Sequence, residues 1–306
     1  MDNVSDSIVP RTIGQIGLLL TFCLFLYFIN LGQWDLWNPD EPRYGQVARE
    51  IVQSGDWILM HNNGKMYTDK PPLFFWLIAF SSYLWQGFSS FSVRFPSALF
   101  GTLTVLLAYF LGRNIYTSRS GFYSGLILAT SLEFAYLSTR SNIDVTLTFF
   151  TTASLFCFVQ WYQWIPPHRS RLPKGERDET RGNSMRRESL RSFWIYGFYV
   201  GMALATLTKG PVGFILPLLV GLIYLLVQRD WKGIKEMKLP TGMLLLLFLV
   251  LSWYIPAVLK GGQVYLNETL FKHSLNRYSG GWSHVRPFYY YLYNFPAQFL
   301  PWFIFL

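Results

Sequence analysis

The stretch TGMLLLLFLVLSWYIPAV, residues 241–258, is eighteen residues long and contains no charged side chain. As an α-helix it would be about 27 Å long, close to the ~30 Å hydrocarbon core of a bilayer. Its apolar residues form one unbroken run and do not recur at the helix or strand period of a soluble domain. The stretch therefore predicts a transmembrane helix.

Six further runs of the same kind predict additional spans, at about 12–30, 94–112, 121–138, 145–163, 193–208 and 211–227. Over the 306 residues, 51% are hydrophobic and only 14% are charged, against about 25% charged in a typical soluble domain. Both cysteines lie within these runs as small apolar residues and do not indicate a redox compartment. We predict an all-α membrane protein, a multi-span helical bundle forming one module over residues 1–306.

The first run could also be a secretory signal peptide. It is long for one, acids and Arg11 precede it, and no Ala-x-Ala site follows, so we interpret it as an uncleaved span. At the other end, the chain stops at Leu306 within a new apolar run that begins at Phe299. We expect this module to be the N-terminal part of a longer protein.

Basic residues orient the predicted bundle. The net charge of +9 suggests nucleic acid as a partner, but Lys and Arg gather in short connections and form no basic stripe, so we expect no nucleic acid. The connections 112–119, 165–192 and 228–239 are basic and are assigned to the cytoplasm. Residues 165–192, rich in Arg, Gly and Ser, predict a flexible loop there. Loops 31–93 and 259–295 then fall on the outer side of the membrane.

This count of sides allows only one span between residues 72 and 112. The stretch 72–88 is short, opens at Pro71-Pro72 and contains Ser, Trp and Tyr, so we predict an amphipathic helix at the outer interface.

The same topology places nine charged or titratable residues on the outer side. Ionisable residues near hydrocarbon are costly and usually functional. They are Asp40, Glu41, Arg43, Asp69, Lys70, Asp144, Lys209, His273 and Arg277.

The segment WNPDEPRY, residues 37–44, is the strongest motif. After it, apolar residues from Tyr44 to Val52 recur at helical spacing, and Gly55 stands where a C-terminal cap belongs. Asp40 is suited to be the N-cap of that helix, and capping alone would account for the two acids. Alternatively, Asp40 and Glu41 are catalytic, because a carboxylate fixed at the membrane surface can act as a general base or bind a metal.

The other candidate residues each carry two interpretations. Asp69 and Lys70 form a loop ion pair, or Lys70 binds a phosphate. Arg140 and Asp144 form a pair at the mouth of a span, or take part in substrate binding and catalysis. Lys209 lies in a tight outer turn, or attracts an anionic headgroup. His273 is an ordinary loop histidine, or ligates a metal with Asp69 or Glu41.

Five segments together resemble the C-type integral-membrane glycosyltransferases, the superfamily of protein O-mannosyltransferases and the bacterial lipid A aminoarabinose transferases. They occur in order along the whole chain: DEPRYG at 40–45, DKPPL at 69–73, RSNID at 140–144, KGPV at 209–212 and HSLNRY at 273–278, followed by RPFYYY at 286–291.

The resemblance implies transfer of a sugar from a polyprenyl-phosphate donor to a lipid, glycan or protein acceptor at the outer face, as in lipid A modification. It implies catalytic roles for Asp40, Glu41 and Asp144, and a divalent metal (Zn, Mg or Mn) at Asp69 and His273. Asp69 stands where the aminoarabinose enzymes have Glu, and its shorter side chain makes this implied metal site different from theirs. Substrate binding would fall to Arg43, Tyr44, Lys70, Arg140, Lys209, Arg277 and Tyr278.

Two other classes compete with the transferase. A transporter or flippase for polyprenyl-linked lipids would place polar residues and broken helices in the middle of its spans. The predicted spans are apolar at their centres, with charge at one end, which favours chemistry at the surface. A scaffold subunit with only membrane lipids as partners would not need the one-sided charge.

Overall fold

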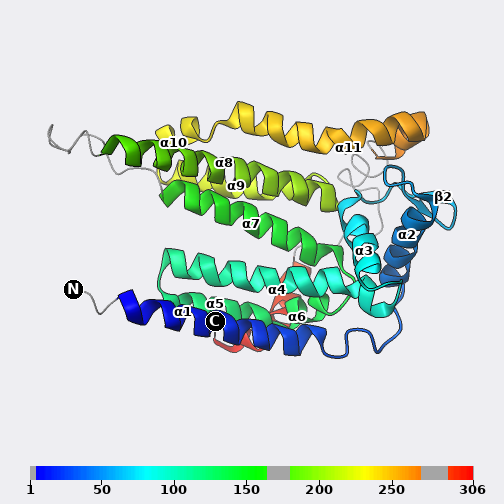
Figure 1. Cartoon of the computed structure of the whole chain (residues 1–306), viewed down its shortest axis with the longest axis horizontal. Helices are drawn as coiled ribbons and strands as arrows, with labels where there is room; N and C mark the ends of the chain where they lie inside the picture. Colours follow the sequence, from blue (N-terminus) through cyan, green and yellow to red (C-terminus); the bar gives the residue numbers. More distant parts are fainter. Residues whose placement is uncertain (1–4, 164–179, 270–288, 306) are drawn as a thin grey trace.

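The computed structural model describes residues 5–163, 180–269 and 289–305. The protein is a bundle of long helices that run alongside one another, with two shorter helices lying across one end (Figure 1). The bundle consists of α1 (Ser5–Cys23) with a π-helical turn (Leu24–Phe28), α4 (Ser90–Ile115), α5 (Ser118–Thr130), α7 (Ile143–Gln163), α8 (Thr180–Lys209), α9 (Val212–Val227) and α11 (Leu239–Asn267). The predicted all-α membrane bundle is confirmed.

The shorter elements connect these helices. The first outer loop contains α2 (Asp40–Ser54), a hairpin of β1 (His61–Asn62) and β2 (Lys65–Met66), and α3 (Leu73–Leu84). The antiparallel hairpin pairs His61 with Met66. Elsewhere lie α6 (Leu132–Ser138), α10 (Trp231–Glu236), α13 (Tyr289–Gln298) and a 3-10 turn (Trp302–Phe305). Both amphipathic helices predicted for the first outer loop are therefore present.

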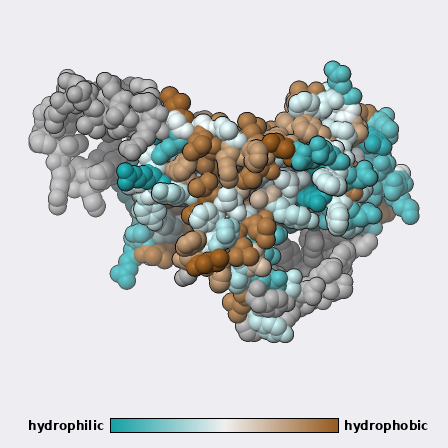
Figure 2. Space-filling model, turned by 90° about the horizontal axis from the view of Figure 1, so that it is seen from below, coloured by the Kyte–Doolittle hydropathy of each residue, from teal (hydrophilic) through white to brown (hydrophobic). Residues whose placement is uncertain are grey.

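Three described helices are long and apolar enough to cross a membrane: Ser90–Ile115, Ile143–Gln163 and Leu239–Asn267. Apolar helices shorter than these are Thr12–Phe28, Leu73–Leu84 and Val212–Val227. Figure 2 shows apolar side chains over the middle of one face and hydrophilic ones gathered at the end that holds α2 and α3. This distribution fits a bundle with its middle in hydrocarbon and α2 and α3 at a membrane surface.

Two predicted boundaries are wrong. The run 121–138 is broken at Ser131, whose extended backbone (φ −64°, ψ 126°) separates α5 from α6. The loop expected at 165–192 overlaps α8, which begins at Thr180, because the charged stretch before the apolar run continues the same helix. Residues 164–179 lie outside the described part of the chain.

Two buried clusters hold the bundle together, one joining α7, α8, α9 and α11 and the other joining α1, α4 and α5. At the α4–α5 contact the backbones almost touch, since a Cβ at Gly112 would lie 2.9 Å from the Cα of Gly121. Small residues at such contacts are typical of packing between membrane helices. A third cluster packs α2 and α3 onto the starts of α4 and α7, and this third cluster positions the candidate site.

Candidate active site

The candidate site lies at the end of the bundle covered by α2 and α3 (Figure 1). Helix α2 ends as its sequence predicts, because Gly55 adopts a left-handed conformation (φ 70°) and donates its N–H to the carbonyl of Ile51. Its apolar face, formed by Tyr44, Val47, Ala48 and Ile51, is buried. Tyr44 packs edge-on against Phe74 of α3 at 5.6 Å between ring centroids, so α2 and α3 form one unit.

The predicted N-cap of α2 is wrong. The capping position is occupied by Pro39, which has no side-chain hydrogen bond to the helix, and Asp40 is the first helical residue. Its carboxylate pairs instead with the guanidinium of Arg43, one turn further along. Because the Asp40 side chain remains 53% exposed, its carboxylate is accessible from outside the helix.

Glu41 occupies a different environment from its neighbour. The residue is 3% exposed, and its carboxylate accepts two hydrogen bonds from Arg94 of α4, from Nε at 2.9 Å and from Nη2 at 2.8 Å. It also accepts the backbone N–H groups of Trp37 at 2.7 Å and Ser141 at 2.6 Å. Burial by itself would raise the pKa of Glu41, but these donors outweigh it and lower the pKa below its ordinary value.

Arg94 uses its remaining donors on the first loop. Nη1 bonds the carbonyls of Leu31 and Trp34, and Nη2 bonds the carbonyl of Asp35 at 2.7 Å. Together with Glu41, Arg94 therefore joins four segments: the start of the first outer loop, the start of α2, α4 and the turn before α7. The catalytic role expected of Glu41 does not suit a carboxylate engaged in this way, whereas a role in positioning Asp40 does.

Tyr67 belongs to the site and was missed by the sequence reasoning. Its hydroxyl is buried and, within the described part of the chain, has no hydrogen-bond partner, and the same is true of Nε of Arg43. Burial raises the pKa of Tyr67, the charge of Arg43 opposes the rise, and Asp69 and Asp40 add to it. These interactions place Tyr67 among the candidate residues. Its only signal in the sequence is its position two residues before Asp69-Lys70.

Asp144 and Lys209 form an ion pair between the start of α7 and the end of α8. The predicted pairing of Asp144 with Arg140 is therefore wrong. The charges of Asp40 and Asp144 both act on Tyr44, whose pKa is raised first by burial and then by these carboxylates. Tyr44 is thus near the carboxylates of both helices, and the Lys209-Gly210 turn between α8 and α9 brings its lysine to the same end.

Arg140 approaches Glu41 instead, with Nη1 3.7 Å from Oε2. Its guanidinium lies over the rings of Trp37 at 5.4 Å and Tyr136 at 5.5 Å. Stacking between two aromatic rings leaves the edge of a guanidinium available for further hydrogen bonds. Arg140 therefore lies beside the Glu41–Arg94 pair, with an aromatic residue on each side.

The loop between α2 and α3 is attached to α11. Lys260 pairs with Asp56 at 2.7 Å, and Trp253 donates its indole N–H to the carbonyl of Ile58. Further along, the hydroxyl of Thr68 donates to the carboxylate of Glu268 at 2.8 Å. The next two residues, Asp69 and Lys70, are half-buried and precede α3. These contacts hold the Asp69-Lys70 segment beside the start of α2.

The expected metal site remains a prediction. Within residues 5–163, 180–269 and 289–305, no group of three or more His, Cys, Asp or Glu side chains could hold a metal ion. Asp69 is described, but His273, Arg277 and Tyr278 lie outside the described residues.

The chain matches the family model for dolichyl-phosphate-mannose-protein mannosyltransferases over residues 14–271. It belongs to this mannosyltransferase family. One relative is an undecaprenyl phosphate-α-4-amino-4-deoxy-L-arabinose arabinosyl transferase of Pseudomonas paraeruginosa, which is 32% identical over 287 residues. The match covers 93% of this chain and 48% of that protein. An uncharacterized Aquifex aeolicus protein is 31% identical, covering 93% of this chain and 51% of its own. The chain thus spans about half the length of these relatives.

Among solved structures, the chain resembles ArnT from Cupriavidus metallidurans bound to undecaprenyl phosphate, with a TM-score of 0.81, 25% identity, and coverage of 96% of this chain and 50% of that one. An oligosaccharyltransferase of Archaeoglobus fulgidus shares the fold alone, with a TM-score of 0.56, 14% identity, and coverage of 96% of this chain and 37% of that one. The mannosyltransferase family and the C-type glycosyltransferase fold therefore agree with the resemblance seen in the sequence.

Proposed function

We propose that the protein transfers a sugar from a polyprenyl-phosphate carrier to a hydroxyl or phosphate group of a lipid, glycan or protein acceptor. The observation that carries the proposal is that two buried donors, Nε of Arg43 and the hydroxyl of Tyr67, have no hydrogen-bond partner in the described part of the chain, near the exposed carboxylate of Asp40. A phosphate accepts such hydrogen bonds well. Family membership and the undecaprenyl phosphate bound to ArnT support the same donor class.

In the proposed reaction, positively charged and hydrogen-bonding side chains act on the departing phosphate, and the carboxylate of Asp40 acts on the acceptor. The bond between the sugar and the carrier phosphate breaks, and its electron pair stays on the phosphate. Arg43, Tyr67 and Lys70 stabilise the negative charge that develops there, because they provide oriented positive charge and donors in a poorly hydrated site. Asp40 takes the acceptor proton as the new bond to the sugar forms. The products are the glycosylated acceptor and the free polyprenyl phosphate.

The remaining charges take supporting roles in the proposal. The Glu41–Arg94 pair fixes the start of α2 and so holds Asp40 in one orientation. Asp144 and Lys209 serve the acceptor side, where their exposed pair can open to admit a polar group. The active face in this proposal is the outer or periplasmic one, and the basic connections at the opposite end of the bundle support that orientation.

A lipid-linked donor accounts for the position of the site. The isoprenoid chain of a polyprenyl phosphate stays in hydrocarbon while its phosphate reaches the interface. Exposed aromatic and aliphatic side chains lie around this end, including Phe80, Tyr83 and Trp85 of the α3 region. A soluble nucleotide-sugar donor would not need these side chains beside the charged residues.

The second candidate function is a carrier that moves polyprenyl-linked lipids without transferring the sugar. The break between α5 and α6 at Ser131 is the feature that favours it, since broken helices are common in transporters. The first function is favoured by the exposed carboxylate and the absence of a similar acid from the middle of the long helices α4, α7 and α11, as far as the structure describes them.

The test is release of free undecaprenyl phosphate by purified protein in detergent. The protein is given a synthetic undecaprenyl-phosphate sugar and a solubilised bacterial cell-envelope extract that contains lipid, glycan and protein acceptors, and the free carrier is measured by mass spectrometry. Transfer to any acceptor releases it, so the assay does not depend on which acceptor reacts. A carrier that only transports would bind the donor and release none.

A further inference from the structure

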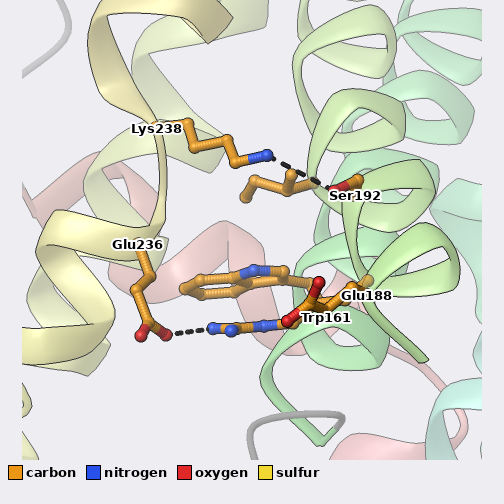
Figure 3. A pocket seen from close by; sticks show the side chains of 7 residues that line it. Trp161, Glu188, Ser192, Glu236 and Lys238 are labelled. Carbon is orange, nitrogen blue, oxygen red and sulfur yellow. Dashed lines mark hydrogen bonds and ion pairs between the residues drawn. The ribbon is translucent and has the colours of Figure 1, made fainter. Parts of the chain in front are cut away.

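A second pocket lies at the opposite end of the bundle from the candidate active site. It has a volume of about 250 Å³ and is lined by side chains from α7, α8 and the connection between α10 and α11 (Figure 3). The side chains that matter are Trp161, Glu188, Arg191, Ser192, Glu236 and Lys238. None of the functions considered above uses these residues.

The two helices that reach this pocket fix its depth in the membrane. Asp144 and Trp161 are seventeen residues apart on α7, about 25 Å along the helix. Arg191 and Lys209 are eighteen residues apart on α8, about 27 Å. Because Asp144 and Lys209 contact each other at the active-site end, the pocket lies roughly one hydrocarbon thickness away, at the other membrane interface.

The surroundings of the pocket match that level of a bilayer. Trp194 and Trp231 belong to the same end, and Tyr196 lies under the ammonium group of Lys238 at 5.3 Å. Trp and Tyr are enriched where headgroups meet hydrocarbon. The 229–238 segment beside the pocket also carries four basic residues, and basic segments at this level attract anionic lipids.

The pocket holds an arginine with an unused donor. The guanidinium of Arg191 lies over the ring of Trp161 at 5.4 Å and is ion-paired with Glu236 (Figure 3). Its Nε is buried and has no hydrogen-bond partner among the residues that the structure describes. Stacking and pairing fix the guanidinium plane, so this donor has a fixed direction.

Lys238 provides the second donor. Its ammonium group donates to the hydroxyl of Ser192 at 3.3 Å, a long hydrogen bond that an anion can replace (Figure 3). Lys238 itself has a left-handed backbone (φ 53°) at the start of α11, which fixes the point from which the side chain reaches the pocket. Two cationic donors from different elements therefore face one small polar space.

The balance of charge limits the ligand. Arg191 and Lys238 line the pocket and carry two positive charges, and the exposed Lys232, outside the lining and 3.9 Å from Glu236, adds a third beside it. Glu188 and Glu236 carry two negative charges, so one positive charge remains. A phosphodiester has a single negative charge and matches this excess, whereas free phosphate at neutral pH carries between one and two charges and would meet repulsion from the acids.

We propose that this pocket binds the phosphodiester headgroup of an anionic phospholipid in the leaflet opposite the active site. Arg191 and Lys238 bind the phosphate oxygens, and the buried ring of Trp161 supports the guanidinium of Arg191. The site would anchor to one lipid the ends of α7, α8 and α11 that lie farthest from the candidate active site, independently of the transfer reaction.

The test is native mass spectrometry of the intact protein titrated with dioleoylphosphatidylglycerol in detergent. Lys238→Gln should weaken lipid binding roughly tenfold, the loss of one charge-assisted hydrogen bond. Lys235→Gln is the matched control, because Lys235 is exposed on the same segment and does not line the pocket. It should change the affinity less than twofold, and Lys238→Arg should restore most of the binding lost in Lys238→Gln.

Equal losses in Lys238→Gln and Lys235→Gln would overturn the proposal, because they would indicate diffuse attraction to a basic surface. Displacement of the lipid by an equal concentration of inorganic phosphate would also overturn it, since the site would then recognise a free anion. If Lys238→Gln does not fold, Ser192→Asp tests the same space by adding a negative charge. It should also lower the affinity at least tenfold, and unchanged binding in Ser192→Asp would contradict the assignment.

Discussion

Glu41 and Arg94 form a buried ion pair, with Nη2 2.8 Å from Oε2, that joins the start of α2 to α4. The pair separates the two acids of the 40–41 motif into different roles. Among the described residues, Asp40 is exposed and pairs with its helical neighbour Arg43, whereas the carboxylate of Glu41 accepts four hydrogen bonds in the protein interior. One acid is thus arranged for chemistry and the other for holding the site together.

Removing Arg94 should destabilise the protein strongly. In Arg94→Ala the buried carboxylate of Glu41 loses its counter-ion and three carbonyls lose a donor, and breaking a buried pair costs about 3–5 kcal/mol. The free energy of unfolding in detergent is the measurement. Arg49→Ala, an exposed arginine of α2, is the control and should change it by less than ~1 kcal/mol. Equal stability of Arg94→Ala and the parent would show that the pair is not structural.

Acidification should lower the folding stability of the protein, because it protonates Glu41. The folded-state pKa of Glu41 is lowered, so its contribution to stability is complete above the unfolded pKa of about 4.3 and is lost as the pH falls through the lower folded value. We expect the thermal midpoint of the parent to be level near neutrality and to fall below about pH 4. Glu41→Gln should start less stable and lose less on acidification. Parallel pH profiles for the two proteins would assign the acid sensitivity to other groups.

The hydroxyl of Tyr67 should matter for the donor and not for the fold. Because this buried hydroxyl has no partner in the described chain, Tyr67→Phe should leave the thermal midpoint unchanged or slightly raised. If the hydroxyl donates to the carrier phosphate, the same variant should weaken binding of undecaprenyl phosphate by roughly tenfold. Tyr83→Phe, an exposed tyrosine of α3, is the control and should change neither quantity. Loss of stability without loss of affinity in Tyr67→Phe would assign the residue to packing.

The ion pair between Asp144 and Lys209 allows two readings that a double-mutant cycle can separate. If the pair only joins α7 to α8, then Asp144→Asn, Lys209→Met and the double variant should lose similar amounts of activity. If each residue contacts a substrate, the two losses in activation free energy should add. The fold-reduction in rate of the double variant should then be about the product of the two single fold-reductions. We expect the second result. Measured transfer rates at saturating donor provide the comparison.

The sequence predicted the fold well because hydrophobic length decides which segments enter a membrane. The amphipathic face of α2 and the glycine at its end were also correct, since both depend on local periodicity and turn chemistry. The break at Ser131 was missed because the apolar run continues across it, and only packing shows where the backbone turns extended. The helical start of α8 was missed because polar composition alone resembles that of a loop.

The sequence predicted several of the residues that the structure brings to this end of the bundle, but it did not predict their pairings and missed Arg94 and Tyr67. Charge near hydrocarbon identified Asp40, Glu41, Asp144 and Lys209, because burial of ions is costly whatever the fold. Arg94 was missed since it stands at the start of an apolar run and looks like a boundary residue. Partners that are 53 residues apart, such as Glu41 and Arg94, can be identified only once the helices are packed.

The central claim is that Asp40 takes the acceptor proton in transfer from a polyprenyl-phosphate donor. The most direct measurement is the rate at which intact, purified Asp40→Asn protein releases undecaprenyl phosphate from an undecaprenyl-phosphate sugar, with Asp35→Asn, an exposed acid of the same loop, as the matched control. Loss of a general base lowers a rate by roughly 10²–10⁴-fold. We predict such a loss for Asp40→Asn at unchanged donor affinity and thermal midpoint, and a rate within twofold of the parent for Asp35→Asn. A folded Asp40→Asn protein that releases the carrier at the parental rate would contradict the account.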